Sequence, residues 1–544
     1  MPGPGDSAGA SAPRRAERTT TGTRADLATF VRRHWFEILG LLVPTALAAG
    51  LVLYGLSGRE VWIDEADTFA TASQHGLTLW HWALNDGGNM VAYYLGMHFY
   101  TEVFGTSEVT LRLPSALAAI ATVPAGYLLL RRLFDSRAAV FGAFFLASSL
   151  ALVWWAQTAR GYLLGVFFGT TAALFLVEAV ETRRRGAYVA FVVASLLAVY
   201  TILLTALVIA AQACTLVFRR RADVEVRRLL TAGSTIVVLS IPLAAAAVIR
   251  GTAPIEWLSS VGPVFGTGNK YLVKVMASAG ITGTPGTRAA HYLLLAMLAA
   301  WALGAAFLLL SVVRTGRSRE SWGYVLLIAW MVLPFAASYV ISVAIHPVLS
   351  DRYILAVVPA GSMLAGVACS RLRPWPLAVA AGVVMMVMRT WVAVPALGRP
   401  LEDWRGAVTA VVDRSQPHDC IAFFVSDGFD AFDYYALRLP TGHGPLPVSV
   451  LPATSWQSRT PYVLDPATIP PARWPAVRTQ CPRLWLVITH QGPSNNPSPT
   501  GSAYKREQYN NRVTLLTEIN ASYGQTYQVG IPGLALTLFT RLGQ

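Results

Sequence analysis

Long apolar segments alternate with short polar connections over most of the chain. Eleven of them come close to the roughly 20 residues that a helix needs to cross the hydrocarbon core of a bilayer. They cover residues 36–56, 110–130, 137–156, 162–180, 186–199, 201–218, 229–249, 291–313, 322–345, 353–370 and 374–395. The pattern predicts an α-helical polytopic membrane protein with about eleven transmembrane helices.

Basic side chains gather on every second connection between these segments. The clusters are Arg131, Arg132 and Arg137; residues 183–185; residues 219–221 with Arg227 and Arg228; Arg314, Arg317 and Arg319; and Arg371 and Arg373. Positively charged loops stay on the cytoplasmic side of a membrane. We therefore expect a multi-pass plasma-membrane protein with a cytoplasmic N-terminus, and the odd number of spans places everything after residue 396 on the extracytoplasmic side.

Composition agrees with a membrane protein. Only 13% of the 544 residues are charged, against about 25% in soluble proteins. The formal charge of +14 is also what a nucleic-acid-binding protein could carry, but such binding needs one basic patch. Here the charge follows the membrane topology, so we expect membrane lipids and no nucleic acid among the partners.

Three regions follow from the pattern. Residues 1–35 read as a disordered basic cytoplasmic tail, residues 36–395 as the transmembrane module, and residues 396–544 as an extracytoplasmic α/β domain. In the last region, residues 420–425, 484–490 and 534–542 read as strands and residues 402–415 and 504–520 as helices, whereas residues 440–482 read as loop. We expect this domain to cap a site or to recognise an acceptor. The sequence leaves open whether Cys420 and Cys481 form a disulfide, and whether Asp427, Asp430, Asp433, Tyr434 and Tyr435 bind glycan or form an ordinary polar surface.

The first outer loop, residues 57–109, carries unusual chemistry. It holds seven acidic residues and one basic residue, and Asp64 and Glu65 follow the first span closely. Two aromatic, amphipathic segments, residues 68–84 and 90–104, are predicted to lie flat in the membrane interface. A solvated acidic loop is the simple explanation. However, a carboxylate held at the interface is also well placed to act as a general base towards a hydroxyl group, and we favour this interpretation.

Basic residues on the outer side are few. Arg160, Lys270, Lys274 and Arg352 are the ones that could gather beside the acidic loop. Long basic side chains often extend along a membrane interface without further function, but arginine also matches the geometry of a phosphate group. An acidic loop with sparse cations thus indicates a base and a phosphate site. A transporter would instead concentrate ionisable residues in the middle of its spans.

A set of ordered motifs resembles one family of membrane enzymes. The motifs are Asp64-Glu65 after the first span, an aromatic loop through Tyr93-Tyr94, FGTSEVTLRLPSALAAI, RRLF, WAQTARGY and a late DRY at residues 351–353. Together they resemble the GT-C membrane glycosyltransferases, and most closely the branch of protein O-mannosyltransferases and the lipid A aminoarabinose transferase. The likeness is strongest over residues 60–165.

This resemblance implies an inverting transferase that moves a sugar, mannose or arabinose, from a polyprenyl-phosphate carrier to the hydroxyl of a glycan, lipoglycan or protein. Asp64 and Glu65 match the catalytic pair of the family, with Asp64 as the base. Donor phosphate is expected at Arg352, Arg160 and Lys270. The expected substrate-binding residues are Asp86, Asn89, Tyr93, Tyr94, Tyr162, His346 and Asp351.

The chain also departs from the family and leaves some questions open. Relatives often have His-Pro-Pro before the aromatic pair, whereas this chain has Asp86-Gly-Gly-Asn89-Met90, so the acceptor pocket differs. We expect no cofactor, although Asp64, Glu65 and Asp86 together could hold a hard divalent cation. The alternative function is a transporter or flippase of polyprenyl-linked lipids.

Overall fold

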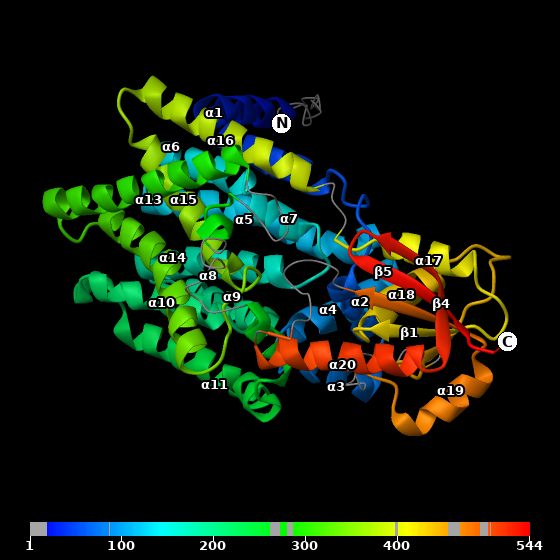
Figure 1. The fold of residues 1–544 in the computed structure, drawn as a ribbon. Helices are drawn as coiled ribbons and strands as arrows, with labels where there is room; N and C mark the ends of the chain where they lie inside the picture. The colour runs from blue at the N-terminus through cyan, green and yellow to red at the C-terminus, as the bar shows by residue number, and fades with distance from the viewer. Residues whose placement is uncertain are drawn as a thin grey trace, which may run out of the picture.

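The computed structural model describes residues 19–85, 87–261, 273–279, 287–397, 401–454, 468–489, 499–500 and 502–543. A helical module extends to Leu397, and a smaller α/β domain follows at one end of it, beside α2, α3 and α4 (Figure 1). Helix α1 (Thr19–Leu53) begins within the predicted tail of residues 1–35, because residues 24–35 contain no proline or glycine to stop a helix.

Seven helices of the described chain are long and apolar enough to cross a membrane. They are His34–Leu53 of α1, α5 (Glu108–Leu133), α8 (Tyr162–Thr182), α11 (Val226–Arg250), α13 (Arg288–Thr315), α14 (Arg319–Ala344) and Trp375–Pro395 of α16 (Trp375–Leu397). The pair α6 (Ser136–Ala147) and α7 (Leu150–Ala156), bent by 52°, makes an eighth if it counts as one span. The protein is therefore a multi-pass membrane protein.

Shorter apolar helices account for the remaining predicted spans. They are α9 (Arg185–Thr201), α10 (Thr205–Cys214) with η1 (Thr215–Phe218), and η4 (Ile354–Val357) with α15 (Val358–Ser370). Each of the eleven predicted segments thus overlaps a helix or a bent pair. That all eleven cross the bilayer, and which ends face outwards, stay predictions.

Polar residues at the helix ends explain several boundaries. Helix α5 begins where Ser107 Oγ accepts a hydrogen bond from the backbone N–H of Thr110, and Asp135 caps α6 in the same way. Such side chains satisfy N–H groups that have no partner inside the helix. Arg131 and Arg132 end α5, where positive charge interacts favourably with the helix dipole.

Three short helices lie in the connection at residues 57–109, which we predicted to be the first outer loop: α2 (Ile63–Ala72), α3 (Gly76–Asn85) and α4 (Val91–Phe104). The predicted segment 90–104 matches α4, but the prediction of a single segment over residues 68–84 is wrong. The chain breaks after Ala72 and resumes at Gly76, whose φ of 57° suits glycine. This break lets α2 turn its two faces towards different neighbours.

The C-terminal domain is built on a five-stranded mixed sheet. Its strands are β1 (Cys420–Phe424), β2 (Val448–Leu451), β3 (Arg483–Thr489), β4 (Tyr523–Ile531) and β5 (Leu534–Arg541), in the order β2-β1-β3-β5-β4. Strand β1 pairs in parallel with β2 and β3, whereas β5 is antiparallel to β3 and β4. The expected α/β architecture is confirmed, although β4 was not predicted.

Helices cover both faces of this sheet. Ile421 and Phe423 belong to the same apolar cluster as α17 (Trp404–Val412) and α18 (Gly428–Ala436), and that cluster continues into the helical module. Ala422 and Phe424 point to the opposite face, with α19 (Trp474–Gln480) and α20 (Ala503–Asn520). Alternate residues of a strand face opposite sides of a sheet, which explains the division.

The interpretation of residues 440–482 as loop is wrong in two places. Strand β2 and helix α19 both lie in this stretch, together with the short helix η5 (Pro471–Arg473). Strand β2 has only four residues and is defined by its pairing with β1, so it leaves almost no periodic signal. The structure also joins Cys420 to Cys481 in a disulfide, which the sequence had left open.

Candidate active site

An ion pair between Asp64 and Arg352 lies at the centre of the candidate site. Asp64 stands in the first turn of α2, and Arg352 in the segment between α14 and η4. Arg352 Nη1 donates to Asp64 Oδ2 at 2.7 Å and lies 3.5 Å from the hydroxyl of Tyr162. The two side chains remain 18% and 17% exposed. Residues 288 positions apart therefore meet at one place that is partly open to solvent.

Aromatic rings surround the guanidinium of Arg352. The rings of Trp62 and Trp155 lie 5.9 Å from its central carbon, and that of Trp257, in η3 (Ala253–Val261), lies at 4.8 Å. Burial lowers the pKa of Arg352, but Asp64 together with Tyr162, Asp351 and Tyr353 more than offsets this effect, so the pKa lies above the ordinary arginine value. The cation is thus fixed, permanently charged and partly shielded from water, which strengthens its attraction for an anion.

A second ion pair lies one turn further along α2. Arg160 Nη1 donates to Asp67 Oδ2 at 2.6 Å and to the hydroxyl of Tyr94 at 2.9 Å, and Tyr94 donates to the same carboxylate oxygen at 3.2 Å. Burial lowers the pKa of Arg160, whereas Tyr94 and the carboxylates of Asp64 and Asp67 raise it well above the ordinary value. The two Asp–Arg pairs therefore belong to one charged cluster.

Glu65, next to Asp64 in the sequence, faces a different environment. Both of its oxygens accept from Arg112 at 2.7 Å, and Oε1 also accepts from the backbone N–H of Ala159 at 2.7 Å. Both side chains of the pair are only 1% exposed. Arg112 also donates to the carbonyls of Leu56, Arg59 and Glu60.

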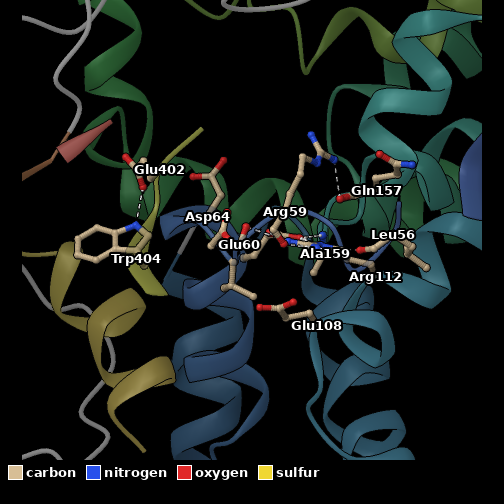
Figure 2. Close-up of polar contacts among 12 residues, drawn as sticks. Leu56, Arg59, Glu60, Asp64, Glu108, Arg112, Gln157, Ala159, Glu402 and Trp404 are labelled. Carbon is tan, nitrogen blue, oxygen red and sulfur yellow. Dashed lines mark hydrogen bonds and ion pairs between the residues drawn. The ribbon is translucent and has the colours of Figure 1, made fainter. Parts of the chain in front are cut away.

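Figure 2 shows Asp64 pointing away from Glu108 and from Arg112, whose guanidinium holds the backbone leading into α2. This geometry favours a positioning role for Glu65: the Glu65–Arg112 pair fixes the start of α2, and thereby the direction of Asp64. Direct action of Glu65 on substrate stays a prediction.

The turn at residues 154–161 is tied to the start of the first loop. Arg59 donates to the carbonyl of Gln157 at 2.8 Å and stacks 4.9 Å from the Trp154 ring, while the Gln157 amide donates to the carbonyls of Val52 and Tyr54. Burial and the neighbouring charge of Arg112 lower the pKa of Arg59 to about 10. These contacts set the turn that presents Arg160.

The C-terminal domain also contacts this region. The Tyr435 hydroxyl, on α18, accepts from the backbone N–H of Val61 at 2.7 Å and donates to Glu108 at 2.6 Å, and Arg405 pairs with the same carboxylate. The Tyr434 hydroxyl donates to the carbonyl of Thr106 at 2.9 Å. Both tyrosines are buried, so neither a glycan-binding role nor an exposed polar surface fits them. Instead they hold the C-terminal domain against the helical module, and one contact is with Val61, three residues before Asp64.

The structure brings some of the predicted site residues together. Asp64, Arg352, Arg160, Tyr94 and Tyr162 form the cluster described above. Arg160, only 9% exposed, faces Asp67 instead of open space. Its predicted contact with donor phosphate therefore has less geometric support than that of Arg352.

Other predicted residues lie at the edge of the cluster or outside the described chain. Asn89 accepts from the backbone N–H of Leu203 at 3.2 Å. Asp351 Oδ1 accepts from the backbone N–H of Arg352 at 2.9 Å, which shapes the loop. His346 lies in the same segment, and its Nε2 is buried. Lys270 and Asp86 lie outside the described residues.

Tyr93 is buried beneath the turn that carries Arg160. A Cβ added at Gly161 would lie 3.1 Å from the Cβ of Tyr93, so the backbone of Gly161 approaches this side chain closely. A role of Tyr93 in substrate binding stays a prediction.

Lys274 lies on the short helical piece within residues 273–279.

Sequence reasoning missed Asp67, Arg112 and Trp257. Asp67 follows Asp64 by three residues, and this spacing places both on one helix face. That signal was available once α2 was recognised as a helix. Nothing in the sequence marked Trp257, because its position over Arg352 depends on how two distant segments pack.

Among the described residues, Asp64 and Glu65 do not face a common cation site. Glu65 is occupied by Arg112 and Ala159, and Asp86 lies outside the described residues, so the predicted trio with Asp64 is not assembled in the described part of the chain. Among those residues no group of three His, Cys, Asp or Glu side chains is arranged to hold a metal ion. The expectation of no cofactor, with a divalent cation as the alternative, stays a prediction.

Comparison with known proteins identifies the class of fold. Residues 88–249 match the family model described as dolichyl-phosphate-mannose-protein mannosyltransferase. The fold is similar to that of ArnT from Cupriavidus metallidurans bound to undecaprenyl phosphate, with a TM-score of 0.53 and 16% sequence identity over 92% of this chain and 97% of that one. It is also similar to the oligosaccharyltransferase of Archaeoglobus fulgidus in complex with Zn and sulfate, with a TM-score of 0.50 and 12% identity over 91% of this chain and 72% of that one.

A search of curated protein sequences finds no match. The chain thus has the fold of the GT-C membrane glycosyltransferases. The resemblance to the mannosyltransferase and aminoarabinose transferase branches, first seen in the sequence motifs, is confirmed by the family model and by the similarity to ArnT.

Proposed function

We propose that the protein is an inverting glycosyltransferase that moves a sugar from a polyprenyl-phosphate carrier to an acceptor hydroxyl at the outer face of the membrane. The observation that carries this proposal is the ion pair between Asp64 and Arg352, 2.7 Å apart and partly exposed amid aromatic rings. A base and a cation held side by side are what transfer from a glycosyl phosphate requires.

The chemistry follows from these two side chains. The donor phosphate binds the guanidinium of Arg352, whose planar set of N–H donors matches phosphate oxygens. Phosphate thereby replaces Asp64 as the partner of Arg352, and the freed carboxylate accepts the proton of the acceptor hydroxyl. The acceptor oxygen forms a bond to C1 of the sugar on the face opposite the phosphate, the bond from C1 to the phosphate oxygen breaks, and polyprenyl phosphate leaves with its electron pair.

The ion pair also sets an order of events. Arg352 occupies Oδ2 of Asp64 at 2.7 Å, so the donor phosphate must take over the guanidinium before that oxygen can accept the proton of the acceptor hydroxyl. We therefore expect donor to bind before proton transfer begins.

Solved relatives support a lipid-linked donor. ArnT, of similar fold, was crystallised bound to undecaprenyl phosphate, and the matching family model describes enzymes named for dolichyl-phosphate-mannose. Mannose and arabinose are our candidates for the sugar, and a glycan, lipoglycan or protein is the acceptor. We place the reaction in cell-envelope glycan synthesis.

The test is a transfer assay with purified protein in nanodiscs. Radiolabelled polyprenyl-phosphate sugars are supplied with a crude envelope extract as acceptor, and wild type is compared with Asp64→Asn. We expect label to move into the extract with wild type and transfer to fall by about 1000-fold in the variant, since a general base contributes a factor of about 100 to 10,000. Glu102→Gln, which changes a surface carboxylate 56% exposed, is the matched control and should transfer normally.

The outcomes separate enzyme from transporter. If wild type transfers no sugar but moves the labelled lipid across proteoliposome membranes, and Asp64→Asn does the same, the protein is a flippase and the proposal is wrong. Equal transfer by wild type and Asp64→Asn would show that another group is the base.

A further inference from the structure

Two carboxylate–arginine pairs on α2 differ sharply in their access to solvent. In the Glu65–Arg112 pair both side chains are 1% exposed. In the Asp67–Arg160 pair the arginine is 9% exposed but the carboxylate is 34% exposed. Asp67 is therefore held on the side of Arg160 and open on the other side, next to the site of Asp64 and Arg352.

The buried side of Asp67 is firmly held. Its Oδ2 accepts from Arg160 at 2.6 Å and from Tyr94 at 3.2 Å. The backbone carbonyl of Arg160 in turn accepts from Ser115 at 2.7 Å. Among the described residues none donates to Oδ1 of Asp67, which leaves one carboxylate oxygen of fixed direction as a hydrogen-bond acceptor.

The position of this oxygen is set by the helix. Side chains three residues apart on a helix are neighbours, with Cβ atoms about 5–6 Å apart, so Asp67 lies one turn along from Asp64. If C1 of the donor sugar sits between Arg352 and Asp64, as the proposed reaction requires, then the rest of the sugar ring lies within reach of Asp67. A carboxylate attracts hydroxyl donors and repels phosphate, so its ligand is the sugar and not the carrier's headgroup.

We propose that Asp67 is a specificity-determining residue that binds the donor sugar, accepting hydrogen bonds from its ring hydroxyl groups through the oxygen that Arg160 does not occupy. This inference rests on the proposed transferase function and adds to it a sugar subsite on the Asp67 side of the base. Arg160 and Tyr94 act as positioning residues, because they hold the carboxylate without touching the sugar.

Binding measurements test this proposal without requiring transfer. The probes are undecaprenyl phosphate and its mannosyl and arabinosyl esters, titrated against full-length protein in nanodiscs. We expect at least one ester to bind wild type about tenfold more tightly than the bare lipid, and Asp67→Asn to lose most of that advantage while still binding the bare lipid normally. Glu102→Gln should behave as wild type does.

A second measurement begins with wild type alone, so its first part does not depend on how the variant folds. Deoxy analogues of the tighter-binding ester are titrated against wild type, and we expect removal of one particular hydroxyl to weaken binding by a similar factor. The same analogue should bind Asp67→Asn no worse than the intact ester, because the partner of that hydroxyl is already gone.

Several results would overturn the inference. One is that neither ester binds wild type more tightly than the bare lipid; another is that the advantage persists in Asp67→Asn. Equal weakening of bare lipid and ester in the variant would instead assign Asp67 to holding Arg160 in place. If wild type binds the ester more tightly than the bare lipid but transfers no sugar, the proposed transferase reaction is wrong, whereas the sugar-binding role of Asp67 stands.

Discussion

The buried pair of Glu65 and Arg112 offers a decisive perturbation, because the sequence marks Glu65 as catalytic while the structure encloses it. Glu65→Gln keeps the size of the side chain and removes its charge. The single amide oxygen of the glutamine can still accept a hydrogen bond from one nitrogen of Arg112. The amide NH₂ group, itself a donor, then faces the other nitrogen of Arg112, which is also a donor. The positive charge of Arg112 is left without an anion at 1% exposure.

The magnitude follows from the contacts. Hydrogen bonds between charged groups contribute about 1.5–3 kcal/mol each, and two of the five that Arg112 donates go to Glu65. Breaking a buried ion pair from one side costs about 3–5 kcal/mol. Since three backbone carbonyls still hold Arg112, we expect a loss near the lower end, about 3 kcal/mol.

The assay measures thermal unfolding and sugar transfer for the same protein samples. Thermal unfolding of purified protein in detergent should show a midpoint several degrees lower for Glu65→Gln than for wild type. Transfer should fall together with the fraction of folded protein and recover at low temperature. Glu102→Gln removes a charge from an exposed pair with His75 and should change stability by less than about 1 kcal/mol.

One result would refute this reasoning. If Glu65→Gln unfolds at the wild-type temperature and binds the donor lipid normally, yet transfers no sugar at any temperature, then Glu65 acts in the chemistry itself. The positioning role would then be wrong and the catalytic pair of the family would apply in full.

Further predictions concern the cation and the domain contact. Arg352→Lys keeps the charge but loses the planar donors, so we expect about tenfold weaker binding of undecaprenyl phosphate by titration; unchanged binding would exclude Arg352 as the phosphate site. Tyr435→Phe removes the hydroxyl between Val61 and Glu108, and should lower kcat more than it raises KM for donor, because the start of α2 loosens; a normal kcat would contradict this. Burial raises the pKa of Tyr434 to about 12, above the usual value of about 10. The stability contributed by its neutral form is therefore present below about pH 10 and is lost as the pH rises towards 12, and in thermal unfolding Tyr434→Phe should show less of this alkaline loss than wild type.

Much of the architecture was available from local pattern. Apolar length identified helices because a bilayer requires about 20 residues per crossing, and every predicted span overlaps a helix or bent pair. The strands β1, β3 and β5 were found because they are buried and continuous. Strand β2 and helix α19 were missed because short elements that depend on a partner carry little signal of their own.

The functional cluster shows the same division. The sequence by itself determined that Asp64 follows the first apolar segment closely and that Arg352 belongs to a short polar segment between two later ones, because apolar length marks where each helix ends. Only the tertiary structure decided that these two meet, that Glu65 turns inwards to Arg112, and that Asp67 remains open. The reason is physical: on a helix adjacent residues point about 100° apart, so which of two neighbouring carboxylates meets solvent depends on what packs against each face, and those partners come from distant parts of the chain.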